Sequence, residues 1–129
     1  MDKAEQYLGI MRKAGRLAVG ERDAGAAVKG GRAALLFLAQ DASDNARRRA
    51  ETFVFGRGTP LIRVPYTKET ISARVGKPGC SMAAVTDPGL AAAFAAALAA
   101  EDPAAYGPVA ARLAQRRGNA TNGKRRMTI

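Results

Sequence analysis

The chain has 129 residues, enough for one domain with its own hydrophobic core and too few for two comfortable ones. Its 21 lysines and arginines outnumber 11 aspartates and glutamates, giving a formal net charge of +10, so we expect a polyanionic partner, with nucleic acid as the leading candidate. Histidine is absent and cysteine occurs once, which excludes Ser-His and Cys-His nucleophile pairs, an internal disulfide, and histidine-ligated or multi-cysteine metal sites.

These absences remove many classes of enzyme, and we expect no cofactor or metal. No apolar run approaches the roughly 18 residues of a spanning helix, so no membrane partner is expected. The first residues, 1–5, lack the basic and then apolar pattern of a signal peptide, and the cytoplasm is the expected compartment. Aromatic residues are only 5% of the chain, which favours recognition of a nucleic acid by charge and shape over a platform of stacked rings.

The first third of the chain predicts two helices around a short strand. Apolar residues recur at helical spacing over 4–11, and Gly15 is placed to end that helix. Residues 17–19 form a short extended piece. Gly20 then opens a second helix, which the glycines at 30–31 end.

The middle of the chain begins with a continuous apolar run, 34–39, which predicts a central strand buried on both faces. Ser43 is a good N-cap for a third helix that extends to about Phe53. A glycine-rich turn precedes a strand-like segment at 61–64, and Thr67 starts a short fourth helix.

Residues 76–79 form a loop, and 81–86 predict a fourth strand. Asp87 is an N-cap followed by proline at the first helical position, and the last helix carries an apolar stripe to Leu98. Strands that alternate with helices through short connections predict an α/β fold: a three-layer α/β/α sandwich whose partly parallel sheet is covered on both faces.

The character of the chain changes near Pro103. We therefore predict a domain over 1–102 and a basic C-terminal tail over 103–129 that contains six basic residues and no acidic one. Within this tail, 109–117 could form a helical turn or two, and 118–123 has the composition of a disordered segment.

Several segments carry a resemblance to a known family. Residues 8–21, LGIMRKAGRLAVGE, resemble the opening of the short bacterial YlxQ-like proteins, which belong to the ribosomal protein L7Ae family. The resemblance continues through 31–43, 64–69, 76–77 and 84–87 and spans roughly 5–98. It implies a mixed, about four-stranded sheet between helices, and a protein that binds kink-turn or similarly bent RNA through one edge of the sandwich. It also implies that the protein is not an enzyme.

The resemblance also implies where RNA binds: the turn and first residues of the second helix, at 20–26, and the loop before the last strand, at 76–81. Lys68 corresponds to a phosphate-contacting position at the start of the fourth helix. The candidate RNA-binding residues are Gly20, Glu21, Arg22, Asp23, Lys68, Gly76, Lys77, Gly79, Cys80 and Ser81. The expected partner is ribosomal or other structured RNA, with ribosomal or transcription-complex proteins as further partners.

The candidate site departs from the usual pattern of kink-turn binders. Arg22 and Asp23 stand where an asparagine–glutamate pair is typical, and Ala26 stands where a lysine is typical. These departures keep open a second hypothesis, a protein-interaction adaptor that retains the fold but has lost specific RNA binding. A third hypothesis, the substrate-binding part of an RNA-modifying enzyme, is weaker because the chain has no room for a catalytic domain.

Other conspicuous residues have simpler explanations. The arginines at 47–49 fan over about 200° of a helix, so a solvated face is the favoured interpretation. Asp41 could help to position the RNA-binding turn, although carboxylates at such positions often cap a helix. Cys80 has no histidine to activate it, so its side chain is more consistent with packing than with reactivity.

Overall fold

The computed structural model describes residues 2–128, with side chains described for residues 2–116. Helices and strands alternate along the chain. Their order is α1 (Lys3–Lys13), β1 (Leu17–Val19), α2 (Glu21–Lys29), β2 (Leu35–Leu38), α3 (Asp44–Val54), β3 (Leu61–Arg63), α4 (Lys68–Val75), β4 (Met82–Val85), α5 (Pro88–Glu101) and α6 (Pro103–Thr128).

Five helices begin at a side chain that caps them, and at α6 this is Asp102, which accepts from the Ala105 N–H at 3.2 Å. The Asp2 carboxylate accepts from the Glu5 N–H at 2.7 Å and starts α1. The predicted caps of the later helices are confirmed: Ser43 accepts from the third residue of α3, Thr67 does so at α4, and Asp87 accepts from two N–H groups at the start of α5. Because each cap satisfies otherwise unpaired helical N–H groups, local sequence alone fixes these starts.

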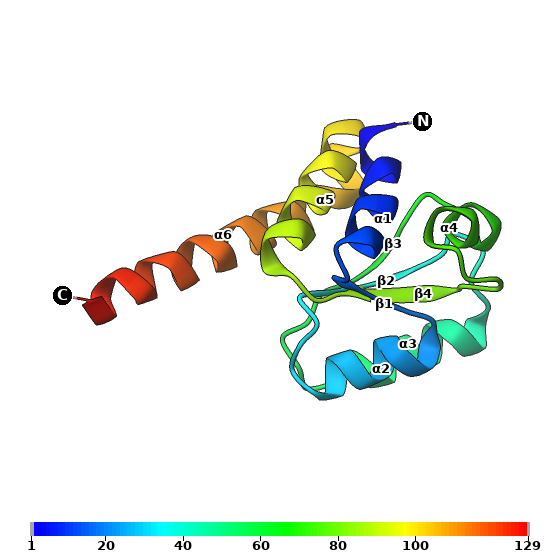
Figure 1. Ribbon diagram of the computed structural model, residues 1–129, viewed down its shortest axis with the longest axis horizontal. Coiled ribbons are helices and arrows are strands. Elements are labelled where there is room, and N and C mark those ends of the chain that lie inside the picture. Colours follow the sequence, from blue (N-terminus) through cyan, green and yellow to red (C-terminus); the bar gives the residue numbers. More distant parts are fainter. Residues whose placement is uncertain (1, 129) are drawn as a thin grey trace.

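The sheet has the strand order β1-β4-β2-β3. β2 pairs in parallel with β3 and antiparallel with β4, and β4 pairs antiparallel with β1, so the sheet is mixed. The two inner strands, β2 and β4, are buried at every position, which confirms that 34–39 contains a central strand. Helices α2 and α3 cover one face, while α1, α4 and α5 lie on the other (Figure 1). The predicted three-layer sandwich is confirmed.

The sheet divides the core into two clusters of different size. On the face of α1, α4 and α5, large side chains such as Phe37 and Phe94 pack with ring centroids 5.6 Å apart. On the other face, α2 and α3 contribute mainly small residues. These include Ala24, Ala27, Ala46 and Ala50, which pack against Leu36, Leu38 and Met82 of the sheet.

The first turns of α6 pack against the domain. Helix α6 begins at Pro103, earlier than the predicted turn or two at 109–117. Tyr106 and Leu113 are buried in the larger core cluster, and the Tyr106 hydroxyl donates to the Arg63 carbonyl oxygen at 2.7 Å. This part of the basic segment therefore contributes to the core, whereas the predicted disorder at 118–123 lies outside the described side chains. Within the described part of the chain, none of the helices has the length and apolar character of a membrane span.

Candidate nucleic-acid interface

The strand register gathers the candidate residues at one end of the sheet. β4 starts where β2 ends, because Met82 pairs with Leu38, and β1 ends beside them, because Val19 pairs with Ala83. β3 runs parallel to β2 and ends at the same side. The segments that follow β1 and β3 and precede β4 therefore meet at this end, which we call the loop end; it lies at the right of the sheet in Figure 1.

Gly20 and Lys77 make the closest link between the two predicted RNA-contact segments. Lys77 Nζ donates to the Val19 carbonyl oxygen at 3.0 Å, 58 residues away in sequence. A Cβ on Gly20 would lie 2.8 Å from that Nζ, so the lysine passes directly over the glycine. Gly20 also has φ 93° and ψ 162°, a conformation essentially restricted to glycine. The backbone conformation therefore requires glycine at this position, and a Cβ would in addition displace the Lys77 side chain.

The loop before β4 is shaped by two more glycines and a buried thiol. Gly76 ends α4 in the left-handed conformation with φ 73°, and Gly79 has φ 68°. The Cys80 side chain is 2% exposed, and its backbone N–H donates to Ser72 Oγ at 3.0 Å. Burial raises the pKa of the Cys80 thiol. This side chain consequently packs beneath the loop, and contact with a ligand would be left to its neighbours.

The first turn of α2 presents charge to solvent. Glu21 pairs with Arg49 of α3, with 3.0 Å between oxygen and nitrogen, while Arg22 and Asp23 are exposed. No side chain caps α2 at Gly20, so the N–H groups of its first turn are open to an acceptor from outside. Arg22, Ala26 and Lys29 follow one another along one side of the helix and line a depression with Phe53.

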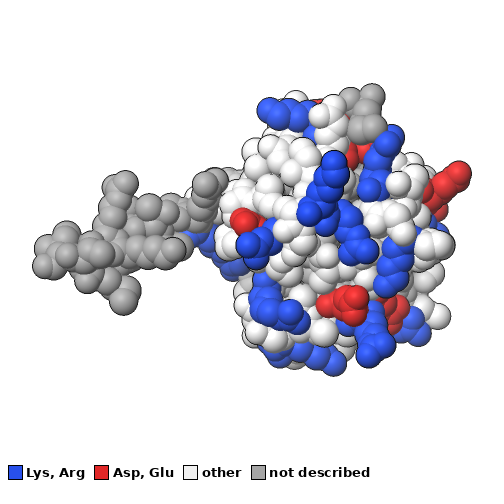
Figure 2. Space-filling model, in the orientation of Figure 1, with Lys and Arg blue, Asp and Glu red and all other residues white. Residues whose placement is uncertain are grey.

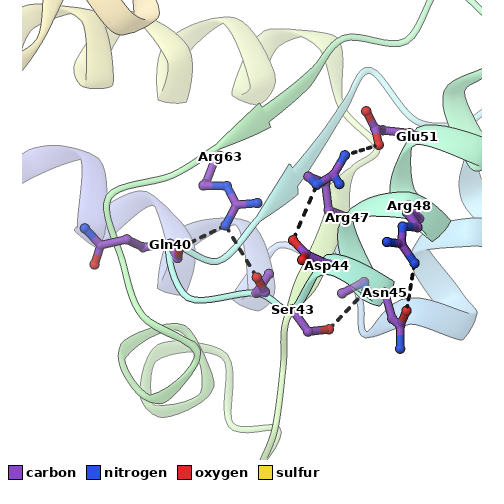
Figure 3. A network of polar contacts seen from close by, with 10 residues as sticks. Gln40, Ser43, Asp44, Asn45, Arg47, Arg48, Glu51 and Arg63 are labelled. Atoms are coloured by element: carbon purple, nitrogen blue, oxygen red, sulfur yellow. Dashed lines mark hydrogen bonds and ion pairs between the residues drawn. The ribbon is translucent and has the colours of Figure 1, made fainter.

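Lys68 is positioned from the other side of the loop end. Its backbone N–H donates to Asp41 Oδ1 at 2.8 Å, so Asp41 secures the start of α4 instead of capping α3. Arg63 holds the turn that carries Asp41, because its guanidinium donates to the carbonyl oxygens of Gln40 at 2.9 Å and Ala42 at 3.5 Å (Figure 3). Asp41 follows β2 and Gly20 follows β1, and β4 lies between these two strands, so Lys68 is held at a different part of the loop end from Gly20.

Comparison with known protein families shows which family the chain belongs to. The profile of the ribosomal protein L7Ae/L30e/S12e/Gadd45 family matches residues 2–95, well over half of the chain. The chain belongs to this family. Among curated protein sequences, none matches it.

Solved structures share the family fold. A protein of unknown function from Bacillus halodurans C superposes with a TM-score of 0.69 at 23% sequence identity, over 76% of this chain and 98% of the other. The Giardia lamblia 15.5kD RNA binding protein superposes with a TM-score of 0.59 at 15% identity, over 73% of this chain and 80% of the other. At these identities the likeness concerns the fold.

In this family member, the three arginines of α3 serve different partners. Arg47 contacts Asp44 and Glu51 on its own helix, and Arg48 reaches Asn45 (Figure 3). Arg49 instead crosses to Glu21 at the start of α2. The predicted fan is confirmed, and one of the three, Arg49, stands at the edge of the loop end.

Sequence reasoning missed two residues that organise the loop end. Arg49 approaches Glu21 over 28 residues of chain, and Arg63 reaches the turn after β2 over 23. Neither contact has a local sequence signal, because both arise from the packing of separate elements. Among the predicted residues, Gly20 and Lys77 touch, and the Ser81 carbonyl oxygen accepts from the Ala39 N–H at 2.8 Å. Lys68 contacts Asp41 through its backbone N–H instead.

Proposed function

We propose that the chain binds structured RNA through the loop end. The observation that carries the proposal is the closure of Lys77 over Gly20, which joins the two segments implied in RNA contact into one surface. Membership in the ribosomal protein L7Ae/L30e/S12e/Gadd45 family supports it, as does the fold likeness to the Giardia lamblia RNA binding protein.

The loop end offers each kind of contact that a bent RNA needs. Lysine has three donors, and Lys77 uses one on Val19, so two remain for phosphate oxygens. Arg22 supplies a planar fork for a phosphate or a guanine edge, and Asp23 supplies an acceptor. The uncapped first turn of α2 adds backbone N–H groups aimed at an anion.

We further propose a kink-turn or comparably bent RNA, such as ribosomal RNA, as the ligand, and a place for the chain in the YlxQ-like group. The role is non-catalytic and belongs in the cytoplasm, within ribosomal or transcription complexes. The sequence blocks shared with YlxQ-like proteins support this assignment, including 8–21 and 31–43.

The test compares two RNAs of equal length, a standard kink-turn and an unbent duplex, over a series of salt concentrations. We expect preference for the bent RNA at moderate salt, with affinity that falls as salt rises because phosphates are neutralised. Arg22→Ala should weaken kink-turn binding by about 1–3 kcal/mol if its fork contacts a base. Lys3→Ala, an exposed lysine on α1, is the control and should have little effect.

Equal binding of the two RNAs would remove the kink-turn proposal. A stable protein partner that covers residues 20–26, with no RNA retained, would favour the adaptor alternative instead. The salt series separates these outcomes because a protein contact made mainly by packing depends weakly on ionic strength.

A further inference from the structure

The net positive charge of the domain is concentrated away from the loop end. At the loop end, acidic and basic residues alternate: Glu21, Asp23 and Asp41 stand among Arg22, Lys68 and Lys77. At the opposite end of the sheet, where β2 and β3 begin and α2 ends, exposed cations from the end of α2, the turn before β3 and α6 form a group that we call the basic end. They are Lys29, Arg32, Arg57, Arg112 and Arg116.

Direct contacts bring the basic end together from three separate segments. Arg57 donates to the carbonyl oxygens of Val28 and Lys29 at 3.2 and 3.0 Å, which ties the turn before β3 to the end of α2. From α6, Arg112 donates to the Gly58 carbonyl oxygen at 2.9 Å, and Arg116 Nη2 lies 3.0 Å from where a Cβ of Gly58 would stand. The cations thus form one surface around the turn at 57–58.

Carboxylates do not neutralise this surface. Among the described side chains, every ion pair belongs to Arg47, Arg49 or Arg74, and none includes a cation of the basic end. The nearby carboxylates are committed elsewhere, since Glu51 pairs with Arg47 at 2.6 Å and Asp87 caps α5. In Figure 2, red side chains gather at the lower right of the view, whereas the lower left is blue.

An exposed aromatic ring stands beside the basic end. Phe55 closes α3 two residues before Arg57 and is 86% exposed, far more than Ile10, the other exposed large apolar side chain among the described residues. Arg48, Glu51 and Thr52 line a shallow depression next to the ring. An exposed phenylalanine two residues from Arg57 adds to the cations of the basic end the second contact that a single-stranded nucleic acid uses: a ring for base stacking beside cations for the backbone.

We propose that the basic end is a second RNA-binding surface, which takes a single-stranded segment with its phosphates on the arginines and one unpaired base on Phe55. Arginine forks match phosphate oxygens in a bidentate way, and the carbonyl bonds of Arg57 and Arg112 leave further N–H donors free on each guanidinium. By sequence, residues 117–129 extend the positive charge with four more cations and no acid.

The two surfaces are joined by α2. This helix runs from the loop end to the basic end over nine residues, about 13 Å, and its depression is lined by Arg22 near one end and Lys29 near the other. A bent RNA held at the loop end can therefore pass its single-stranded flank along α2 to the basic end. The basic end goes beyond the proposed function and stands on its own charge and exposed ring.

The first experiment measures binding of the full chain to a single-stranded RNA of about twelve uridines across a salt series. Removal of two charges by Arg32→Gln/Arg116→Gln should reduce the slope of log affinity against log salt by about 1.4, or about 0.7 per lost phosphate contact. The control Lys3→Gln removes one exposed charge from the start of α1, on the other face of the sheet, and should leave the slope unchanged. An equal change per removed charge in both variants, or a change in neither, would overturn the proposal.

The second experiment isolates the ring. Phe55→Leu keeps an apolar side chain but cannot stack in the same way, and it should weaken binding of the uridine RNA about 5- to 150-fold, whereas Phe55→Tyr should bind like the wild type. If the leucine variant bound the uridine RNA as tightly as the wild type, the proposed stacking contact would be refuted. If Phe55→Leu lost binding to anionic vesicles while its RNA binding was unchanged, the ring would serve a membrane surface, and this outcome would also refute the stacking contact.

Arg22→Ala makes the two proposals separable. It should weaken kink-turn binding and leave the uridine RNA bound as before. If the kink-turn test fails while the Arg32→Gln/Arg116→Gln variant still loses uridine RNA, the loop end lacks the proposed function and the basic end retains its own.

Discussion

Gly20→Ala tests the junction of the loop end most directly. The substitution adds one methyl group at a residue whose φ of 93° and ψ of 162° are essentially restricted to glycine, and the new Cβ would lie 2.8 Å from Lys77 Nζ. Two costs therefore add: the strain of the backbone and the displacement of the lysine from the Val19 carbonyl.

The magnitude follows from these two contributions. A non-glycine residue in such a region costs about 1–3 kcal/mol. Loss of the Lys77 hydrogen bond adds about 1 kcal/mol, because its donor is the end of a flexible, exposed side chain and can recover water. We expect Gly20→Ala to lower the free energy of unfolding by about 2–4 kcal/mol, a large fraction of the 5–15 kcal/mol typical of a domain.

Chemical denaturation of three glycine variants separates the two costs. Gly9→Ala lies within α1 with open space around it and should raise stability by up to about 1 kcal/mol, since alanine is the better helix former. Gly76→Ala has a positive φ but no close neighbour, so it should show backbone strain alone. Gly20→Ala should cost the most, and Lys77→Met should recover about 1 kcal/mol of it in a double-mutant cycle.

The reasoning fails if Gly20→Ala is as harmless as Gly9→Ala. It also fails if the cost of Gly20→Ala is the same with and without the lysine, since the closure of Lys77 over Gly20 would then contribute nothing. A variant too unstable to isolate would still be informative, because Gly76→Ala and Lys77→Met can be measured on their own.

Three further predictions concern the core. The buried Cys80 thiol, whose pKa burial raises, should react with a thiol reagent at pH 8 far more slowly in the native protein than in denaturant. Burial and a hydrogen bond to Asp2 also raise the pKa of Tyr66. The contribution of Tyr66 to stability is therefore fully present below a pH of about 10 and is lost as the pH rises further. Tyr66→Phe should lower the free energy of unfolding by about 1–2 kcal/mol at pH 7 and flatten the loss of stability at alkaline pH in denaturation curves. Leu113→Ala should lower the free energy of unfolding by about 2–3 kcal/mol, whereas no loss would mean that α6 is dispensable to the core.

Most of the fold could be predicted from local sequence patterns. The order of helices and strands was predicted because caps such as Ser43, Thr67 and Asp87 act within three or four residues, and because the apolar run at 34–39 announces a strand buried on both faces. The mixed sheet came from the resemblance, since strand order depends on contacts between distant segments. The same limit explains why Tyr106 and Leu113 were placed in a tail: nothing near them in the sequence reveals the surface they cover.

The candidate site was predictable only as far as its segments. The resemblance indicated 20–26 and 76–81, and the structure brings them into contact through Gly20 and Lys77. Whether each predicted residue binds RNA stays a prediction. The contacts of Arg49 and Arg63 could not be predicted, because the sequence does not indicate which distant oxygen atom a long side chain will contact.

The unequal layers on the two faces of the sheet constrain substitution in opposite directions. Between α2, α3 and the sheet, the space is already taken by alanines, and a Cβ on Gly25 would lie 2.6 Å from the Phe53 ring. Larger residues at these helix positions have nowhere to go, while truncation of the alanines has little to remove. The opposite face, filled by side chains such as Phe37 and Phe94, suffers chiefly from smaller residues. Evolution of the α2 and α3 layer, which borders both proposed RNA surfaces, is therefore confined to its outer side, where a change of charge alters what the protein binds without altering how it folds.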